Sequence, residues 1–204
     1  MAAGAAPLSA RLRSQTALLH DQAATILGLP GAIQTLDHYR DCLDRFLGFY
    51  TPLERSLATF VEWYAHGFTL PSPSHSCCLA ADLAVLGTNG PGGSPAPPAL
   101  LPHLPTFAHA LGALYVVEGS TLGGRVILRD VERRLGQQIT GATRFFGGGG
   151  MAAGPVWQQF RTALDGFGDD RPRLCDDVVT GAQRTFRAIL AWFIPFRAAA
   201  AMRP

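Results

Sequence analysis

The chain has 204 residues, of which 48% are hydrophobic and 16% are charged. This length suits one domain, and the apolar fraction excludes an intrinsically disordered chain because it allows a sizeable buried core. The formal net charge of +2 is small, so we predict neither nucleic acid nor an anionic membrane as the main partner. All basic residues are Arg, so an anionic ligand must be met by Arg, hydroxyl or backbone N–H groups rather than by Lys.

The N-terminus and the cysteines bear on the compartment. Residues 1–9 lack the basic start and long apolar stretch of a signal peptide, and no uncharged, consistently apolar window of 18 residues occurs. The cysteines match neither a zinc pair nor a CxxC redox motif, and they stand at Cys42, Cys77, Cys78 and Cys175. We therefore expect free thiols, no transmembrane helix and a cytoplasmic location, with residues 1–8 flexible.

Helical spacing of apolar residues begins close to the N-terminus. The first pattern runs from about Leu8 to Leu27, with Ser9 as the expected N-cap and Gly and Pro just beyond its end. The second pattern runs from about Leu36 to His66. Pro52 lies inside it, which predicts a kink or break near Tyr50.

The remaining chain also shows helical patterns and no useful strand alternation. A short helix is expected over Cys77–Leu86, and the Gly- and Pro-rich residues 87–105 form an irregular surface loop. Further helices are expected over Thr106–Leu135, Pro155–Phe167 and Pro172–Ala200. The sequence thus predicts an all-α fold with six or seven helices in a single domain over residues 1–204.

A glycine cluster, Gly119, Gly123 and Gly124, lies within the longest predicted helix. Each Gly inside a helix costs roughly 1 kcal/mol relative to Ala, so three of them require a compensating reason. One reason is a kinked backbone that approaches a flat ligand closely without side chains in between. The alternative is close helix–helix packing, and the pattern alone leaves both open.

His20 is the histidine with the most informative surroundings. It lies in the first helix in a row with small residues, which leaves room for a large group, and neutral imidazole is a common ligand of haem iron. A histidine without a ligand is the plainer alternative. No HxxxH, HExxH or ExxH pair occurs, so a di-iron or zinc enzyme lacks its ligand set.

Together these residues resemble the haem oxygenase superfamily, specifically the bacterial branch associated with bacteriophytochromes. Two stretches carry the likeness, the LRSQTALLH run that ends at His20 and the LGALYVVEGSTLGG run of residues 111–124. Weaker echoes are the FFG of residues 145–147, the WQQF of residues 157–160 and the TFRAILAW of residues 185–192. The likeness spans roughly Leu8 to Phe193.

The resemblance implies a haem-oxygenase-like helical bundle that sandwiches haem b between a proximal and a distal helix. His20 would be the axial iron ligand, and Gly119, Gly123 and Gly124 would form a kinked distal helix over the haem face. The family opens haem to biliverdin, CO and Fe²⁺ with O₂ and external electrons. Expected partners are a ferredoxin or reductase as electron donor, or ascorbate in vitro, and a bacteriophytochrome as recipient of biliverdin.

Further site residues follow from helical geometry and the family architecture. Ser120 and Glu118 are expected near ordered water on the distal side, where protons are delivered. Haem propionates need cationic or hydroxyl partners. The candidates on the cofactor-binding side are Arg13, Thr16, Tyr115 and Arg184 or Arg187.

One departure from the family keeps two alternatives open. Many relatives place a carboxylate one turn after the proximal histidine, where this chain has Ala24, while Asp21 and Gln22 lie in other helical directions and would act only through water. Ala24 therefore favours a non-catalytic haem or bilin carrier as the alternative. A second alternative is a thiaminase-like relative on the same fold, for which Cys42 is the candidate nucleophile.

Overall fold

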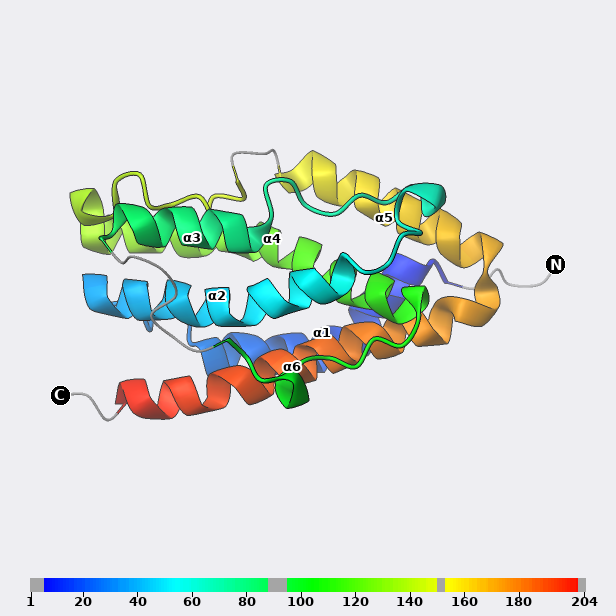
Figure 1. The fold of residues 1–204 in the computed structure, drawn as a ribbon, viewed down its shortest axis with the longest axis horizontal. Helices are drawn as coiled ribbons and strands as arrows, with labels where there is room; N and C mark the ends of the chain where they lie inside the picture. Colours follow the sequence, from blue (N-terminus) through cyan, green and yellow to red (C-terminus); the bar gives the residue numbers. More distant parts are fainter. Residues whose placement is uncertain (1–5, 88–94, 150–152, 202–204) are drawn as a thin grey trace.

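The computed structural model describes residues 6–87, 95–149 and 153–201, which form α-helices and short 3₁₀ turns without a strand (Figure 1). The predicted all-α class is confirmed. The helices are α1 Leu8–Leu27, α2 Leu36–Leu57, α3 His75–Val85, α4 Phe107–Leu135, α5 Ala153–Asp170 and α6 Cys175–Ala201. The 3₁₀ turns are η1 Tyr64–His66, η2 Pro98–Leu100, η3 Gly136–Ile139 and η4 Pro172–Leu174. Parts of the predicted flexible N-terminus and surface loop, residues 1–5 and 88–94, lie outside the described residues.

Side-chain caps fix where several helices begin. The hydroxyl groups of Thr35, Ser74 and Thr106 each accept the backbone N–H three residues later, which satisfies a donor that has no partner within the helix. Gly28 ends α1 in the left-handed conformation at φ 61°, where residues with a side chain are strained. These caps explain why the sequence predicted the starts of α2 and α4, and the end of α1, to within a residue.

Ser9 does not cap α1 as the sequence predicted. Pro7 is the N-cap residue, and Ser9 is already inside the helix and buried. Its backbone N–H and hydroxyl donate to the Asp165 carboxylate of α5 at 2.7 Å and 2.9 Å. A carboxylate from another helix therefore satisfies the start of α1 and ties it to α5.

The second helix is shorter than predicted and is not broken at Pro52. Pro52 has no N–H to give the carbonyl of Gly48, but the N–H of Ala96 donates to that carbonyl at 2.8 Å instead. The helix ends at Leu57 because the next N–H groups bond three residues back, and the Trp63 indole donates to the Leu57 carbonyl. Residues 95–105 thus include a buried anchor, Ala96, rather than only surface loop.

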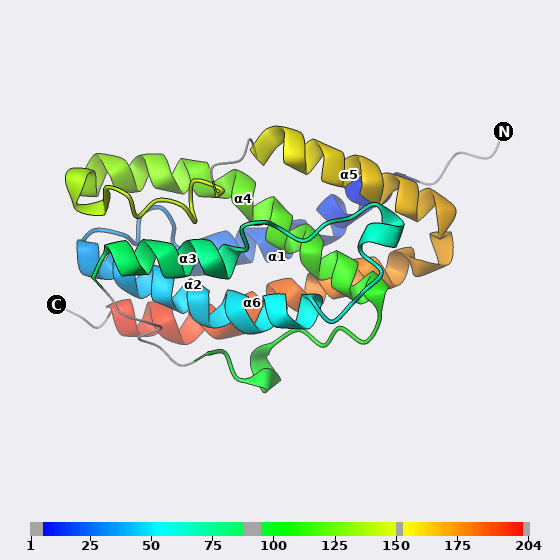
Figure 2. The same cartoon turned by 45° about the horizontal axis from the view of Figure 1, so that its top comes forward.

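The crossing of α4 and α6 is the closest helix contact in the described structure. A Cβ added to Gly112 would lie 1.9 Å from the carbonyl oxygen of Val178, and one added to Gly181 would lie 2.0 Å from that of His109. Only glycine permits this approach. Figure 2 shows α1, α4 and α6 running in the same direction, with the axis of α4 bending about midway.

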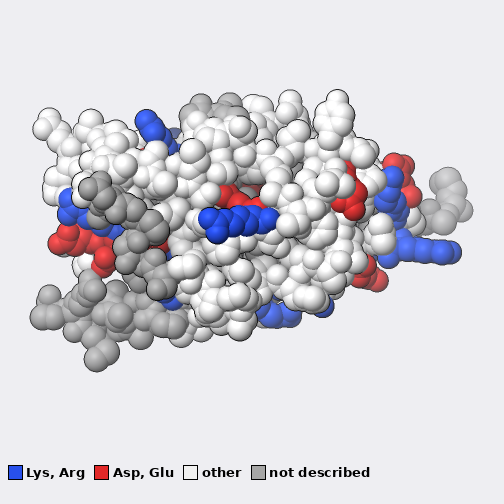
Figure 3. All heavy atoms as spheres, viewed as in Figure 1, with Lys and Arg blue, Asp and Glu red and all other residues white. Residues whose placement is uncertain are grey.

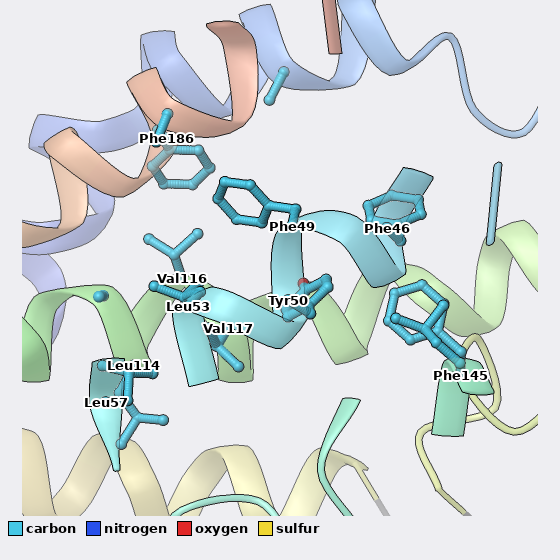
Figure 4. Close-up of a cluster of buried hydrophobic side chains, with 14 of the residues drawn as sticks. Phe46, Phe49, Tyr50, Leu53, Leu57, Leu114, Val116, Val117, Phe145 and Phe186 are labelled. Atoms are coloured by element: carbon cyan, nitrogen blue, oxygen red, sulfur yellow. The ribbon is translucent and has the colours of Figure 1, made fainter. Parts of the chain in front are cut away.

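Both α1 and α4 pack extensively on α6, whereas α1 and α4 are not a closely packed pair. An aromatic cluster from α2, α6 and the segment after η3 fills the core beside them (Figure 4). Its centre is Phe46, whose ring lies 4.7 Å from Phe193 and 5.1 Å from Phe145. The core is therefore built around α6 and α2.

By length and composition alone, one helix among the described residues, Phe107–Ile139, could span a membrane. The sequence prediction missed it because that prediction required a window without any charge. A buried core helix passes the same test, and Leu111 and Leu114 of α4 are fully buried in the protein. On the face seen in Figure 3, charged side chains of both signs are interspersed.

Candidate functional site

The site begins where α1 and α4 meet. Thr16 of α1 is buried, and its hydroxyl donates to the Leu12 carbonyl at 2.8 Å. The Tyr115 hydroxyl of α4 is in hydrogen-bonding contact with the Thr16 side chain. Burial raises the pKa of Tyr115, opposed by Thr16 and by two guanidinium groups, those of Arg161 and Arg13. The sequence predicted only that Thr16 and Tyr115 face the same ligand. In the structure the two side chains also lie next to each other.

Beyond this contact, α1 and α4 continue in the same direction (Figures 1 and 2). His20 lies one turn after Thr16, and Gly119 lies one turn after Tyr115, since a helical turn takes 3.6 residues. Ala24 and Gly123 follow at the next turn. Counted from the contact between Thr16 and Tyr115, His20 on α1 is thus level with Gly119 on α4. The two helices are joined mainly through α6.

The His20 imidazole is accessible to solvent at this level. Its side chain is 69% exposed, and its ring edge meets Phe186 at 6.3 Å between centroids. Its Nδ1 lies 3.3 Å from Oδ1 of Asp21, which corrects the prediction that Asp21 could act only through water. No described contact engages Nε2, so Nε2 is the nitrogen available to a ligand.

The three glycines of the cluster differ in their surroundings. A Cβ at Gly123 would meet nothing within 4 Å, and one at Gly119 would meet only the Trp157 ring at 3.5 Å. A Cβ at Gly124 would lie 2.8 Å from the carbonyl oxygen of Phe146. Gly124 is therefore needed for packing against the segment after η3, which corrects its predicted place over the haem face, while Gly119 and Gly123 fit that place.

Ser120 and Glu118 lie in different surroundings. Ser120 is exposed, and its Oγ lies 3.0 Å from the hydroxyl oxygen of buried Tyr50. Glu118 lines a small pocket together with His75 and Thr121. Burial raises the pKa of the Glu118 carboxyl, and the nearby His75 partly opposes this shift. The two predicted distal residues thus do not share one solvent pocket.

The arginines partly differ from prediction. Arg13 and Arg161 both act electrostatically on Tyr115, and neither forms an ion pair among the described residues. Arg184 donates to the carbonyl of His103 at 2.9 Å, and its role toward a propionate stays a prediction. Its direction depends on how α6 crosses α4, which helical spacing does not reveal.

Sequence reasoning missed Arg161, Trp157, Tyr50 and His75. Trp157 lies 5.4 Å from the Tyr115 ring and beside Gly119, so α5 closes one side of the site. The WQQF echo contained Trp157 and ended one residue before Arg161. That echo was the available signal for α5, whereas nothing in the sequence linked Tyr50 or His75 to Ser120.

These residues fit a haem. No group of three His, Cys, Asp or Glu in the described part of the chain is placed to hold a bare metal ion. A single imidazole such as His20 instead suits a metal that brings its other ligands with it, as haem iron does. The free space at Gly123 leaves that backbone open to a ligand, and Arg13 and Arg161, which form no ion pair among the described residues, are cations that suit propionates.

Comparison with known proteins agrees with this arrangement. Residues 6–194 match the model of the family described as heme oxygenase, which includes every helix named here except the end of α6. A search of curated proteins returned no match. Members of this family bind haem and degrade it. The chain belongs to the haem oxygenase family.

Proposed function

We propose that this chain binds haem b through Nε2 of His20 and converts it to biliverdin, CO and Fe²⁺ with O₂ and external electrons. The observation that carries the proposal is the exposed His20 imidazole, with Nε2 uncommitted, at the level of Gly119 and Gly123 on α4. Bound haem would supply the iron and the oxidisable ring. The protein residues have only to hold it, orient it and provide hydrogen bonds.

Asp21 offers the His20 ring the carboxylate partner that Ala24, which has no carboxylate, does not provide. If Asp21 accepts the Nδ1 proton, Nε2 is left unprotonated and directed outward as a ligand. Such partners of a metal-bound histidine affect affinity or activity by about 10- to 100-fold. The 3.3 Å contact therefore favours turnover over the carrier function that Ala24 alone suggested.

Arg13, Arg161 and Tyr115 are the proposed partners of the propionates. The two guanidinium groups come from α1 and α5, and both act electrostatically on Tyr115. Guanidinium groups match carboxylates in a bidentate fashion, and neither of these two forms an ion pair among the described residues. Arg161 is proposed here in addition to Arg184, to which the sequence gave this role.

The thiaminase-like alternative finds no support at Cys42. The thiol is buried, and burial raises its pKa to about 12, so a thiolate nucleophile is not formed near neutral pH. The non-catalytic haem or bilin carrier is the second candidate, favoured by Ala24. Assignment to the bacterial branch, a bacteriophytochrome recipient and a cytoplasmic location stay predictions.

The test is to add haemin to the purified protein and then ascorbate or a ferredoxin system in air, while the visible spectrum is recorded. The oxygenase predicts a Soret band that decays as the red absorption of biliverdin grows. His20→Ala should abolish the normal ferric-haem spectrum. His103→Ala is the matched control, because His103 is also an exposed histidine and the carbonyl that it offers Arg184 survives the substitution.

Two results would overturn the proposal in different ways. A Soret band that persists under reductant would leave a haem carrier. An unchanged spectrum in His20→Ala would remove His20 as the ligand, whatever the activity.

A further inference from the structure

A polar cluster lies behind the distal helix and reaches Ser120. The imidazole of His75, at the start of α3, stacks on the phenol ring of Tyr50 in α2, with centroids 4.9 Å apart and an interplanar angle of 9°. The Tyr50 hydroxyl is 3.0 Å from Oγ of Ser120. One titratable ring therefore lies face to face with the ring that contacts Ser120.

The direction of the Tyr50–Ser120 hydrogen bond follows from the other partner of Ser120. Its Oγ is 2.7 Å from the carbonyl oxygen of Val117, and a carbonyl can only accept. The single proton of Ser120 is used in that bond, so Tyr50 must donate to Ser120. Any change in the donor strength of Tyr50 therefore changes the hydrogen-bonding capacity that Ser120 offers to a neighbour in the site.

His75 has a buried nitrogen without a partner. Its Nδ1 makes no hydrogen bond and lies 3.6 Å from Oε1 of Glu54. That carboxylate accepts the backbone N–H groups of His75 and Ser76 at 2.7 Å and 3.2 Å, and also the Ser76 hydroxyl. A proton on Nδ1 would complete a charge-assisted bond to Glu54 after a small movement.

Glu54 is held in its ionised form. Burial acts to raise its pKa, but the contacts from His75 and Ser76 outweigh burial, and the pKa of Glu54 is lowered overall. The Glu54 carboxylate is thus a fixed negative charge next to Nδ1 of His75, which has no hydrogen-bond partner among the described residues. Imidazole is also the side chain whose ordinary titration falls between pH 5 and 8.

The other groups around His75 come from three further segments. From α4, Thr121 lies with Oγ1 3.4 Å from Nε2 of His75, and Glu118 lines the same pocket. From α3, the Cys78 thiol lines the pocket, with Asp82 and Arg144 acting electrostatically on it. From the segment after η3, the Phe145 ring lies 6.0 Å away. Together with Glu54, three carboxylates, one arginine and one thiol thus make up the charged and titratable groups named here around the His75 and Tyr50 rings.

We propose that His75 is a pH-sensitive positioning residue that acts through Tyr50 to set the hydrogen bond available from Ser120 on the distal side of the haem. The last part rests on the proposed function, whereas the coupling of His75 to Tyr50 and Ser120 does not. A positive charge against the Tyr50 ring makes its hydroxyl a stronger donor. Protonation of His75 therefore strengthens donation from Tyr50 to Ser120, and loss of the proton weakens it.

The coupling is tested in the protein without haem by NMR. The ring signals of Tyr50 should move with pH at the same midpoint as the ring signals of His75. His75→Phe keeps an aromatic ring in the stack but cannot titrate, so it should remove this movement of Tyr50. Glu54→Gln should lower the His75 midpoint, by removing the fixed negative charge. Tyr50 signals that do not follow His75, or a midpoint that Glu54→Gln leaves in place, would overturn the proposal.

The consequence for the site is tested in the ferric-haem complex. The visible spectrum should show a pH-dependent change with the His75 midpoint, and His75→Phe and Tyr50→Phe should each abolish it, with no further effect in the double variant. His66→Phe is the matched control, because His66 also packs against aromatic rings, those of Phe107 and Phe167.

The two arms separate the possible failures. Absence of haem binding would remove the proposed function and leave the NMR result to decide the coupling. Spectra of the two variants that keep the wild-type pH dependence would remove the link to the haem. If His75→Phe does not fold, Glu54→Gln decides the NMR arm, and Tyr50→Phe, which removes only a hydroxyl, decides the haem arm.

Discussion

Gly112 and Gly123, in the two halves of α4, serve opposite purposes. In the first half, Gly112 allows the backbone of α6 to approach so closely that a Cβ would overlap a carbonyl oxygen at 1.9 Å. In the second half, Gly123 leaves open space, with nothing within 4 Å of the position of a Cβ. The first half is consequently buried core and the second half borders the site. A glycine in a helix thus signals either tight packing or a ligand surface, and only its surroundings distinguish them.

The largest expected effect is that of Gly112→Ala. The added methyl group meets the backbone of Val178 and Ala182, which cannot move without separating α4 from α6. Overpacking of a core costs typically 1–3 kcal/mol, and here we expect about 3 kcal/mol or more of lost unfolding free energy. Urea denaturation measures it. A loss below about 1 kcal/mol would show that the two helices do not need this approach.

Gly123→Ala should raise stability and weaken haem binding, whereas Gly112→Ala lowers stability. Replacement of Gly by Ala inside a helix adds about 0.5–1 kcal/mol to stability where space is free. If Gly123 borders the haem, the same methyl group should weaken haem affinity about tenfold, which corresponds to about 1.4 kcal/mol. Denaturation and haem titration of this single variant provide both numbers. Higher stability with unchanged affinity would place the haem elsewhere.

The two halves should also respond oppositely to pH, starting with His109 near the crossing of α4 and α6. Burial lowers the pKa of His109, although Asp177 partly opposes the shift from 3.9 Å. The unfolded chain then binds the proton more tightly, so stability falls as the pH drops below the ordinary imidazole value of about 6.5. The slope is at most about 1.4 kcal/mol per pH unit for one proton, and His109→Gln should flatten it. Parallel stability–pH curves for the two proteins would contradict this.

The smallest expected effect is that of Glu118→Gln in the second half. Burial raises the pKa of Glu118, so the folded protein binds this proton more tightly than the unfolded chain does. The associated stability is present at low pH and is lost as the pH rises through the folded-state value. At neutral pH the variant should be more stable by less than about 1 kcal/mol, because Glu118 is partly exposed and solvent screens its charge. Thermal unfolding at pH 4 and pH 7 tests it, since the gain should appear only at pH 7.

Local signals in the sequence predicted much of the fold. Capping residues such as Thr106 and a terminal glycine such as Gly28 act within one turn of a helix, and the limits of α1 and α4 follow from them. The continuation of α2 through Pro52 and the role of Ser9 were predicted wrongly because the partners involved, Ala96 and Asp165, come from distant parts of the chain.

The candidate site likewise contains residues that local sequence signals predicted and residues that depend on distant parts of the chain. The motif that contains His20 and the motif that contains Gly119 could be read directly, because each lies on one helix. Arg161 and the contact of Arg184 with the His103 carbonyl were missed, since both depend on how α5 and α6 lie against α4. The partners of Ser120 were out of reach for the same reason, because Tyr50 is 70 residues away along the chain.

The position of α6 between α1 and α4 has a consequence for how the site can change. Both helices pack on α6, so the distance between the histidine and the glycines depends on α6, whose Phe186 meets the His20 ring. Substitution of residues at the ligand surface therefore leaves the distance between α1 and α4 unchanged. A single methyl group added or removed on α6 could change that distance and adapt the site to a thicker or thinner ligand.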